Sequence, residues 1–84
     1  MKNEILNIFR AADLMLVNGE QVLEFSIDNG TMVIDTNNGF SGSFILDDYD
    51  FKPSGKSAIR MINKNGYELA FFQFYTAMNI LELL

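Results

Sequence analysis

The sequence has 84 residues, eleven acids, six bases and a formal net charge of −5, which fits one small domain and disfavours direct binding to nucleic acid. Cysteine and histidine are both absent, so the chain offers no disulfide, no thiolate nucleophile and none of the usual zinc ligands. It also lacks a signal-peptide-like apolar run and the roughly 20 apolar residues of a membrane span. We therefore predict a single domain over residues 1–84 that is cytoplasmic, in the host cell if it is phage-encoded, and that does not bind membranes.

Residues 3–16 are predicted to form an amphipathic helix with Asn3 as its cap. Asn18-Gly19 follows, and Gly adopts the left-handed conformation after a helix without a side-chain penalty. We therefore expect these two residues to end the helix. The apolar side chains that recur at helical spacing are Ile5, Ile8, Phe9, Ala12 and Leu16.

Alternating apolar and polar residues then predict a hairpin around Asn29-Gly30 and a second turn that ends at Gly39. A two-residue loop at Asn29-Gly30 brings Glu24 opposite Asp35 on the face away from the core. A three-residue loop before Phe40 returns the next aromatic residues to the core face. The predicted core-face pairs are Leu23 with Thr36, Phe25 with Ile34, Ile27 with Met32, Gly42 with Ile34 and Phe44 with Met32.

The segment Asp47–Ser57 is interpreted as a polar connection in which Pro53 and Gly55 stop strand pairing. Another hairpin is predicted around Asn65-Gly66. Its second strand, Tyr67–Tyr75, is apolar on both faces, which indicates a central position in a sheet or an interface.

Residues 76–83 are predicted to form a short closing helix with Thr76 as its cap, and one helix from Tyr67 to Leu83 is the alternative. The predicted fold class is thus α+β, with an N-terminal helix, an antiparallel sheet of about five strands in meander order and a short C-terminal helix. The predicted core contains Ile5, Phe9, Leu23, Phe25, Ile27, Met32, Ile34, Phe44, Ile59, Met61 and Phe72.

The possible catalytic and metal-binding patterns are incomplete. Glu24 and Asp35 form a carboxylate pair, but no His, Tyr or Lys in register would set their pKa values apart. The acids after Leu46 lack the spacing of a calcium loop, and "SGKS" lacks the first Gly of a phosphate-binding loop. We therefore predict a protein that is not an enzyme and that uses neither metal nor cofactor.

Charge is distributed unevenly along the chain, with eight acids and no base between Ala11 and Phe51. Such a surface suits a protein partner with a basic surface, of the kind that normally holds nucleic acid. Chance segregation in a short sequence is the alternative explanation. The acids predicted to bind the partner are Glu20, Glu24, Asp28, Asp35, Asp47, Asp48 and Asp50.

The strand Tyr67–Tyr75 also predicts a homodimer, because one helix and a short tail would cover only one face of the sheet. The residues predicted to form that interface are Leu69, Phe71 and Tyr75. A homo-oligomeric structural or assembly subunit is therefore the alternative function, followed by a domain that binds a small ligand.

The segment "DFKPSGKSAIRMINKNG", Asp50–Gly66, resembles the closing hairpin of the phage uracil-DNA glycosylase inhibitors: an acid, an aromatic residue, Lys-Pro, a strand and an Asn-Gly turn. The resemblance covers about a quarter of the chain, and Phe25 stands where that family has the Glu of its inserting edge. It implies a small acidic inhibitor encoded by a phage or mobile element, a class that includes many anti-CRISPR proteins. No functional residue is carried over from it.

Overall fold

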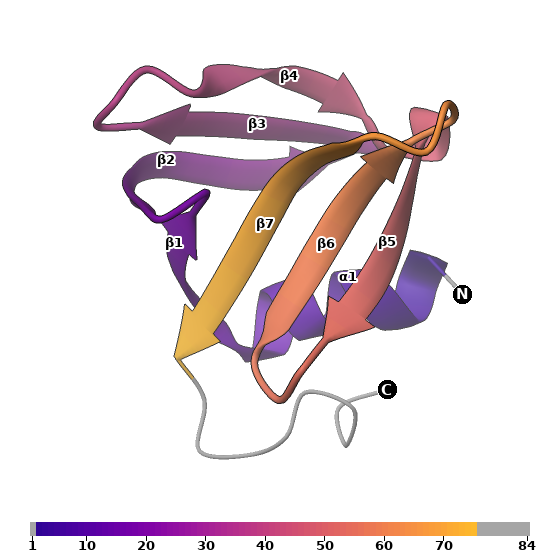
Figure 1. Ribbon diagram of the computed structural model, residues 1–84, viewed down its shortest axis with the longest axis horizontal. Coiled ribbons are helices and arrows are strands. Elements are labelled where there is room, and N and C mark those ends of the chain that lie inside the picture. The colour runs from indigo at the N-terminus through magenta and orange to yellow at the C-terminus, as the bar shows by residue number, and fades with distance from the viewer. Residues whose placement is uncertain (1, 76–84) are drawn as a thin grey trace.

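Within residues 2–75, the part of the chain that the computed structural model describes, one α-helix accompanies a seven-stranded antiparallel sheet (Figure 1). Side chains are described from Leu6 onward. The order of strands in the sheet is β4-β3-β2-β1-β7-β6-β5. The elements are α1 (Lys2–Ala11), β1 (Asp13–Val17), β2 (Glu20–Asp28), β3 (Thr31–Thr36), β4 (Ser41–Ile45), the 3-10 turn η1 (Leu46–Asp48), β5 (Tyr49–Ser54), β6 (Ala58–Asn63) and β7 (Glu68–Tyr75).

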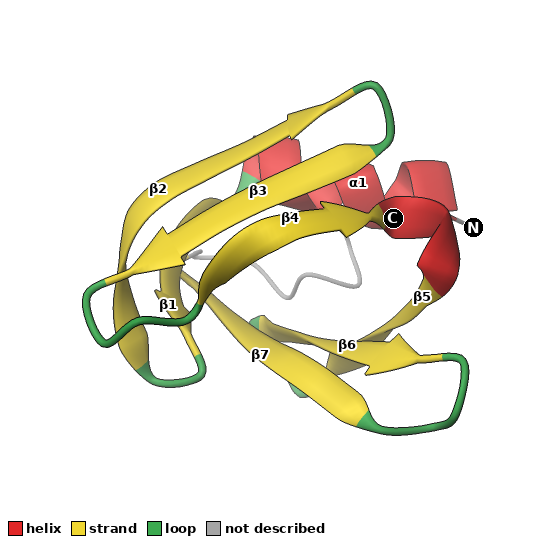
Figure 2. Ribbon diagram, turned by 90° about the horizontal axis from the view of Figure 1, so that it is seen from above, coloured by secondary structure: helices red, strands yellow, loops and turns green. Residues whose placement is uncertain are grey.

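The sheet is curled into a half-barrel. Its two edge strands, β4 and β5, are joined directly by η1, and a link of three residues spans only about 10 Å. The two edges must therefore approach each other at this end of the sheet. Figure 2 shows the resulting halves, β2, β3 and β4 in one and β5, β6 and β7 in the other.

The predicted fold class, with about five strands in one meander, is wrong. Within residues 2–75 the sheet has seven strands in two meanders, β1–β4 and β5–β7, which join by pairing between β1 and β7. The alternative helix from Tyr67 to Leu83 is wrong as well, because Glu68–Tyr75 is strand β7. The helix predicted over residues 76–83 lies outside the described residues.

The N-terminal helix was predicted to reach residue 16, but α1 ends at Ala11. Strand β1 takes the place of the rest of the predicted helix. The apolar run from Leu14 to Val17 fits either conformation, and the strand gains hydrogen-bonded neighbours on both sides, β2 and β7. Asn18 (φ 55°) and Gly19 (φ 75°) therefore form a two-residue hairpin turn instead of a helix end.

The predicted register of β2, β3 and β4 is confirmed over most of its length. The pairs Phe25–Ile34, Ile27–Met32 and Glu24–Asp35 form as expected, and so do Gly42–Ile34 and Phe44–Met32. Leu23 is the exception, because a bulge between Val22 and Glu24 places Val22 opposite Thr36 and leaves Leu23 62% exposed.

The segment interpreted as a polar connection contains strand β5, Tyr49–Ser54, so that interpretation is wrong. Pro53 does not prevent pairing, since β5 is an edge strand and uses only one side of its backbone, opposite β6. Strand β7 occupies the central position predicted for it, between β1 and β6.

The core lies between the two halves of the curled sheet, and α1 closes it through Ile8 and Phe9, together with Ala12, which directly follows the helix. The ring of Phe9 has its centroid 5.1–6.1 Å from the rings of Phe25, Phe51, Phe72 and Phe74, which come from both halves. Of the predicted core, six residues are buried, namely Phe9, Met32, Ile34, Ile59, Met61 and Phe72. Phe25, Ile27 and Phe44 pack against them half-buried, Leu23 is exposed, and the side chain of Ile5 lies outside the described set.

Candidate protein-binding face

The strongest candidate site is the outer face of β2 and β3, where three carboxylates share one side of the sheet. Glu24 lies opposite Asp35 and Asp28 lies opposite Thr31, so these residues alternate with the core-facing Phe25 and Ile27. We call Glu24, Asp28 and Asp35 the acidic face.

The acidic face has no basic partner among the side chains that the structure describes, since none of its three carboxylates takes part in an ion pair with them. From β1 through η1 the sequence has seven acids and no base, whereas β5 through β7 carry two acids and four bases. The uneven charge seen along the chain therefore becomes a difference between the two halves of the folded molecule.

The next strand, β4, extends the acidic face with hydroxyl groups. Ser41 lies opposite Asp35 and Ser43 lies opposite Val33, and both serines are exposed. Sequence reasoning did not include these residues in the site. Continuing the alternation of β3 into β4 would have found them.

The other acids predicted to bind a partner lie in three different places. Glu20 is half-buried and accepts a hydrogen bond from the hydroxyl of Thr36, a buried residue. Asp47 and Asp48 belong to η1, beside the Asn29-Gly30 turn, because the amide of Leu46 donates to the carbonyl of Gly30 at 2.8 Å. Asp50 is exposed on the other half of the sheet, two residues before Lys52 on the same strand.

The acidic face presents carboxylates as its charged groups. Glu24 and Asp35 meet across two strands without a basic side chain between them. Within residues 2–75 no group of three or more acids is arranged to hold a metal ion. Nothing in this arrangement separates one carboxylate as an acid from the other as a base.

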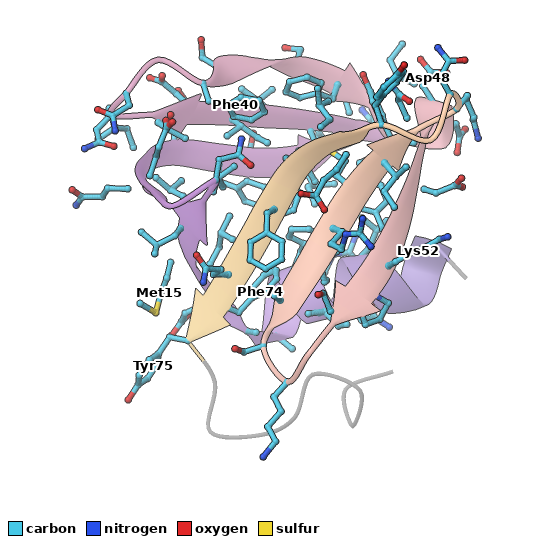
Figure 3. All side chains as sticks on the ribbon, viewed as in Figure 1. Met15, Phe40, Asp48, Lys52, Phe74 and Tyr75 are labelled. Atoms are coloured by element: carbon cyan, nitrogen blue, oxygen red, sulfur yellow. The ribbon has the colours of Figure 1, made fainter. Side chains whose placement is uncertain are left out.

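Of the three residues predicted to form a dimer interface, only two lie on the outer surface of the sheet. Phe71 is half-buried on the outer face of β7 and Tyr75 is 70% exposed at its end, while Leu69 packs against the core. Met15, which the sequence analysis did not include, is 47% exposed at the β1 bulge and projects near Tyr75 (Figure 3). The exposed apolar surface is therefore centred on the β1–β7 pair.

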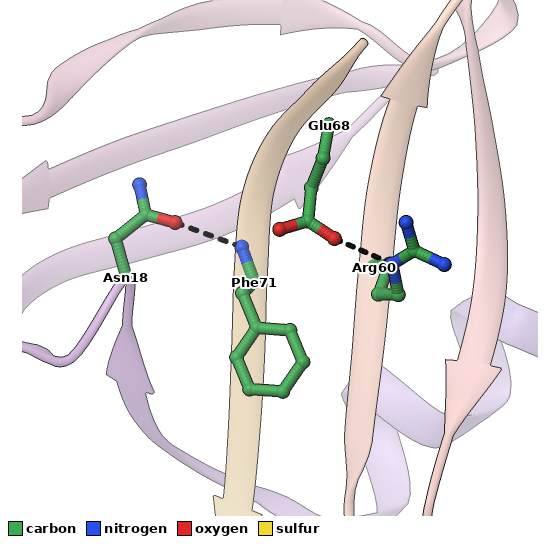
Figure 4. A network of polar contacts seen from close by, with 4 residues as sticks. All are labelled: Asn18, Arg60, Glu68 and Phe71. Carbon is green, nitrogen blue, oxygen red and sulfur yellow. Dashed lines mark hydrogen bonds and ion pairs between the residues drawn. The ribbon is translucent and has the colours of Figure 1, made fainter. Parts of the chain in front are cut away.

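Asn18 and Arg60 make polar contacts with residues of β7, and two of these contacts are drawn in Figure 4. Asn18 donates its backbone N–H to the carbonyl of Phe71 at 2.8 Å, and its side-chain oxygen accepts from the amide of Phe71 at 2.9 Å. Arg60 forms an ion pair with Glu68 on the neighbouring strands. Its guanidinium therefore serves a local contact on the half of the sheet that carries the bases.

No family model, curated protein or solved structure matches the chain. No helix in residues 2–75 has the length and apolar character that crossing a membrane requires.

Proposed function

We propose that this protein is a small acidic binding protein whose acidic face docks on a basic surface of a protein partner. The observation that carries the proposal is the folded charge distribution: Glu24, Asp28 and Asp35 share one face of the sheet, with no base among β1 through η1. Complementary charge accelerates encounter and selects among partners.

The partner class we propose is a nucleic-acid-processing enzyme. Such enzymes bear surfaces rich in Lys and Arg that bind phosphate backbones. A protein of net charge −5 that covers such a surface excludes the nucleic acid and so inhibits the enzyme. The sequence resemblance to phage-encoded inhibitors supports the same class.

Capture from a host lysate with two charge variants tests this proposal. The variant Glu24→Gln/Asp35→Asn should bind the partner about tenfold more weakly, if each carboxylate contributes about 0.7 kcal/mol. Its fold should be unchanged or slightly more stable, because two like charges no longer face each other. Binding is measured by surface plasmon resonance on the purified partner, and folding by circular dichroism.

A matched control separates the acidic face from net charge. The variant Asp13→Asn/Asp50→Asn also removes two negative charges, changing the net charge from −5 to −3, but both residues lie outside the acidic face. It should bind nearly as well as the wild type. Duplex DNA should displace the protein from its partner. Equal losses for both variants, or no competition by DNA, would argue against the proposal.

The second candidate function is assembly through a homodimer. The observation that favours it is the exposed apolar surface on β1 and β7, where Met15 and Tyr75 project close together and Phe71 is half-buried further along β7. We propose that a second copy covers this surface. It lies on different strands from the acidic face, so the two interactions are compatible.

A further inference from the structure

The two edges of the sheet differ in how they are protected against pairing with another strand. β5 carries the charged residue Lys52 and, next to it, Pro53, which has no backbone N–H. Both residues are exposed. Proteins use these residue types to prevent another strand from adding to an edge. β4, with the sequence Ser-Gly-Ser-Phe-Ile, has neither a charge nor a proline.

The backbone groups that β4 presents at its edge follow from its hydrogen bonds to β3. The amide of Thr36 donates to the carbonyl of Phe40 at 3.0 Å at one end, and the amide of Leu46 donates to Gly30 at the other. Hydrogen-bonded and non-hydrogen-bonded pairs alternate in an antiparallel ladder. Counting from either end, Gly42 and Phe44 bond to β3, whereas the N–H and C=O groups of Ser41, Ser43 and Ile45 point away from it.

We propose that β4 accepts an extended strand of the protein partner, which adds to the sheet as an eighth strand. The inference rests on the proposed function and specifies how the partner docks. Ser41, Ser43 and Ile45 are all exposed, and among the described residues β3 is the only strand that pairs with β4 (Figure 2). Their backbone groups provide the hydrogen bonds of strand addition.

The neighbouring side chains select a strand that alternates basic and apolar residues. On the outer face of the sheet, side chains of the added strand would lie next to Ser41 and Ser43 of β4. Asp35 lies on β3, one strand beyond β4. Strands are about 4.8 Å apart, so a Lys or Arg side chain reaches across the small serine to this carboxylate. On its inner side the strand meets Gly42 and the stacked rings of Phe40 and Phe44, 5.8 Å apart, which favour apolar residues.

Charge favours this occupant over a second copy of the chain. Pairing β4 with β4 of another molecule would bring two acidic faces side by side, each without a base. The like charges of the two copies would repel each other across the new pair of strands. A Lys or Arg side chain on the added strand would instead be attracted to Asp35, which lies one strand beyond β4.

The test uses a blocked peptide of about eight residues in which Lys alternates with Val, added to the full-length protein labelled with ¹⁵N. Without peptide, the amides of Ser41, Ser43 and Ile45 should exchange rapidly with solvent, and those of Gly42 and Phe44 slowly. With about 90% of the protein bound, exchange at Ser43 and Ile45 should slow about tenfold, because it then occurs only from the free fraction.

Two changes to the backbone, one on each partner, test whether pairing is by strand addition. A peptide N-methylated at alternate amides keeps every charge but cannot bond to the edge. Ser43→Pro removes an N–H that points away from β3 and leaves the β3–β4 ladder intact. Both should abolish binding, and the control Ser43→Thr should not. The methylated peptide tests wild-type protein, so the result does not depend on how the proline variant folds.

The outcomes separate this inference from the proposed function. If the N-methylated peptide and Ser43→Pro bind normally while Glu24→Gln/Asp35→Asn weakens binding, strand addition is overturned and the acidic face stands. If the backbone changes abolish binding and the charge variant does not weaken it, β4 accepts strands but the proposed function fails. Absence of any peptide binding, or amide protection on β4 that rises with protein concentration alone, overturns the inference.

Discussion

At the residue scale, the Asn-Gly pairs show what a short pattern can and cannot specify. Asn18 and Asn29 both adopt positive φ, 55° and 50°, each followed by a glycine that does the same. The pattern correctly predicted the hairpin turn at Asn29-Gly30, but at Asn18-Gly19 it was interpreted as a helix end, whereas the structure has a second hairpin turn there. The pattern could not indicate which element precedes the turn at Asn18, because β1 is stabilised by strands β2 and β7, and β7 comes some fifty residues later.

Asn18 should contribute more to stability than Asn29, although both have the same backbone conformation. Alanine at either position loses the tolerance of Asn for positive φ, at a cost of about 1–2 kcal/mol. Asn18→Ala also removes the acceptor for the amide of Phe71, which costs about 1 kcal/mol more. Urea unfolding should therefore rank wild type above Asn29→Ala and Asn29→Ala above Asn18→Ala. Equal values for the two variants would mean that the contact with Phe71 contributes nothing.

At the element scale, sequence alternation was informative wherever one face of a hairpin is buried and the other exposed. The pairing of β2, β3 and β4 followed from it, because a shift by one residue would turn Phe25 and Ile27 outward. The same reasoning placed Leu23 in the core and failed, since the bulge beside Val22 leaves no mark in the alternation. The acidic face could be predicted for this reason, and the same register, continued into β4, also implied that Ser41 lies opposite Asp35, although the prediction did not include it.

We expect the packing of Phe9 in the core to stabilise helix α1 more than the helix propensity of its residues does. A helix of ten residues is marginal in water, and Phe9 is 8% exposed among rings from both halves of the sheet. Phe9→Ala should lower the free energy of unfolding by about 3–5 kcal/mol, through lost burial and the cavity left behind.

Leu23→Ala is the matched control for this large effect. The side chain of Leu23 is 62% exposed, so its truncation should change stability by about 0.5 kcal/mol or less. Urea denaturation followed by circular dichroism measures both variants. A loss of several kcal/mol for Leu23→Ala would show that the β2 bulge is absent in solution and that the core-face pair with Thr36 forms after all.

At the scale of the whole molecule, the fold places most of the acids in one half of the sheet and four of the six bases in the other. The sequence gives the order of charges, but their separation in space depends on the pairing of β1 with β7, which joins the ends of the two meanders. That pairing spans most of the chain, and local patterns do not encode it. It also leaves apolar side chains of β1 and β7 on an outer surface, away from α1.

This surface leads to the last prediction, that the protein is a homodimer through β1 and β7. A small domain gains stability by sharing apolar surface with a second copy, and two-fold dimers are the commonest oligomers. Tyr75 and Tyr67 are exposed to the same degree, 70% and 71%, but Tyr67 lies in the β6–β7 turn. Tyr75→Asp should therefore abolish dimerisation, and Tyr67→Asp should not.

Sedimentation equilibrium at micromolar concentration measures the outcome. The wild type and Tyr67→Asp should have twice the mass of the 9.5 kDa chain, and Tyr75→Asp should have the mass of one. Burying an aspartate at the interface without a partner for its charge accounts for the loss. Because Tyr75 is exposed, the substitution should leave the monomer folded, which circular dichroism verifies. A wild-type mass near 9.5 kDa would exclude the dimer and leave the acidic face and the β4 edge as the interaction surfaces of a monomer.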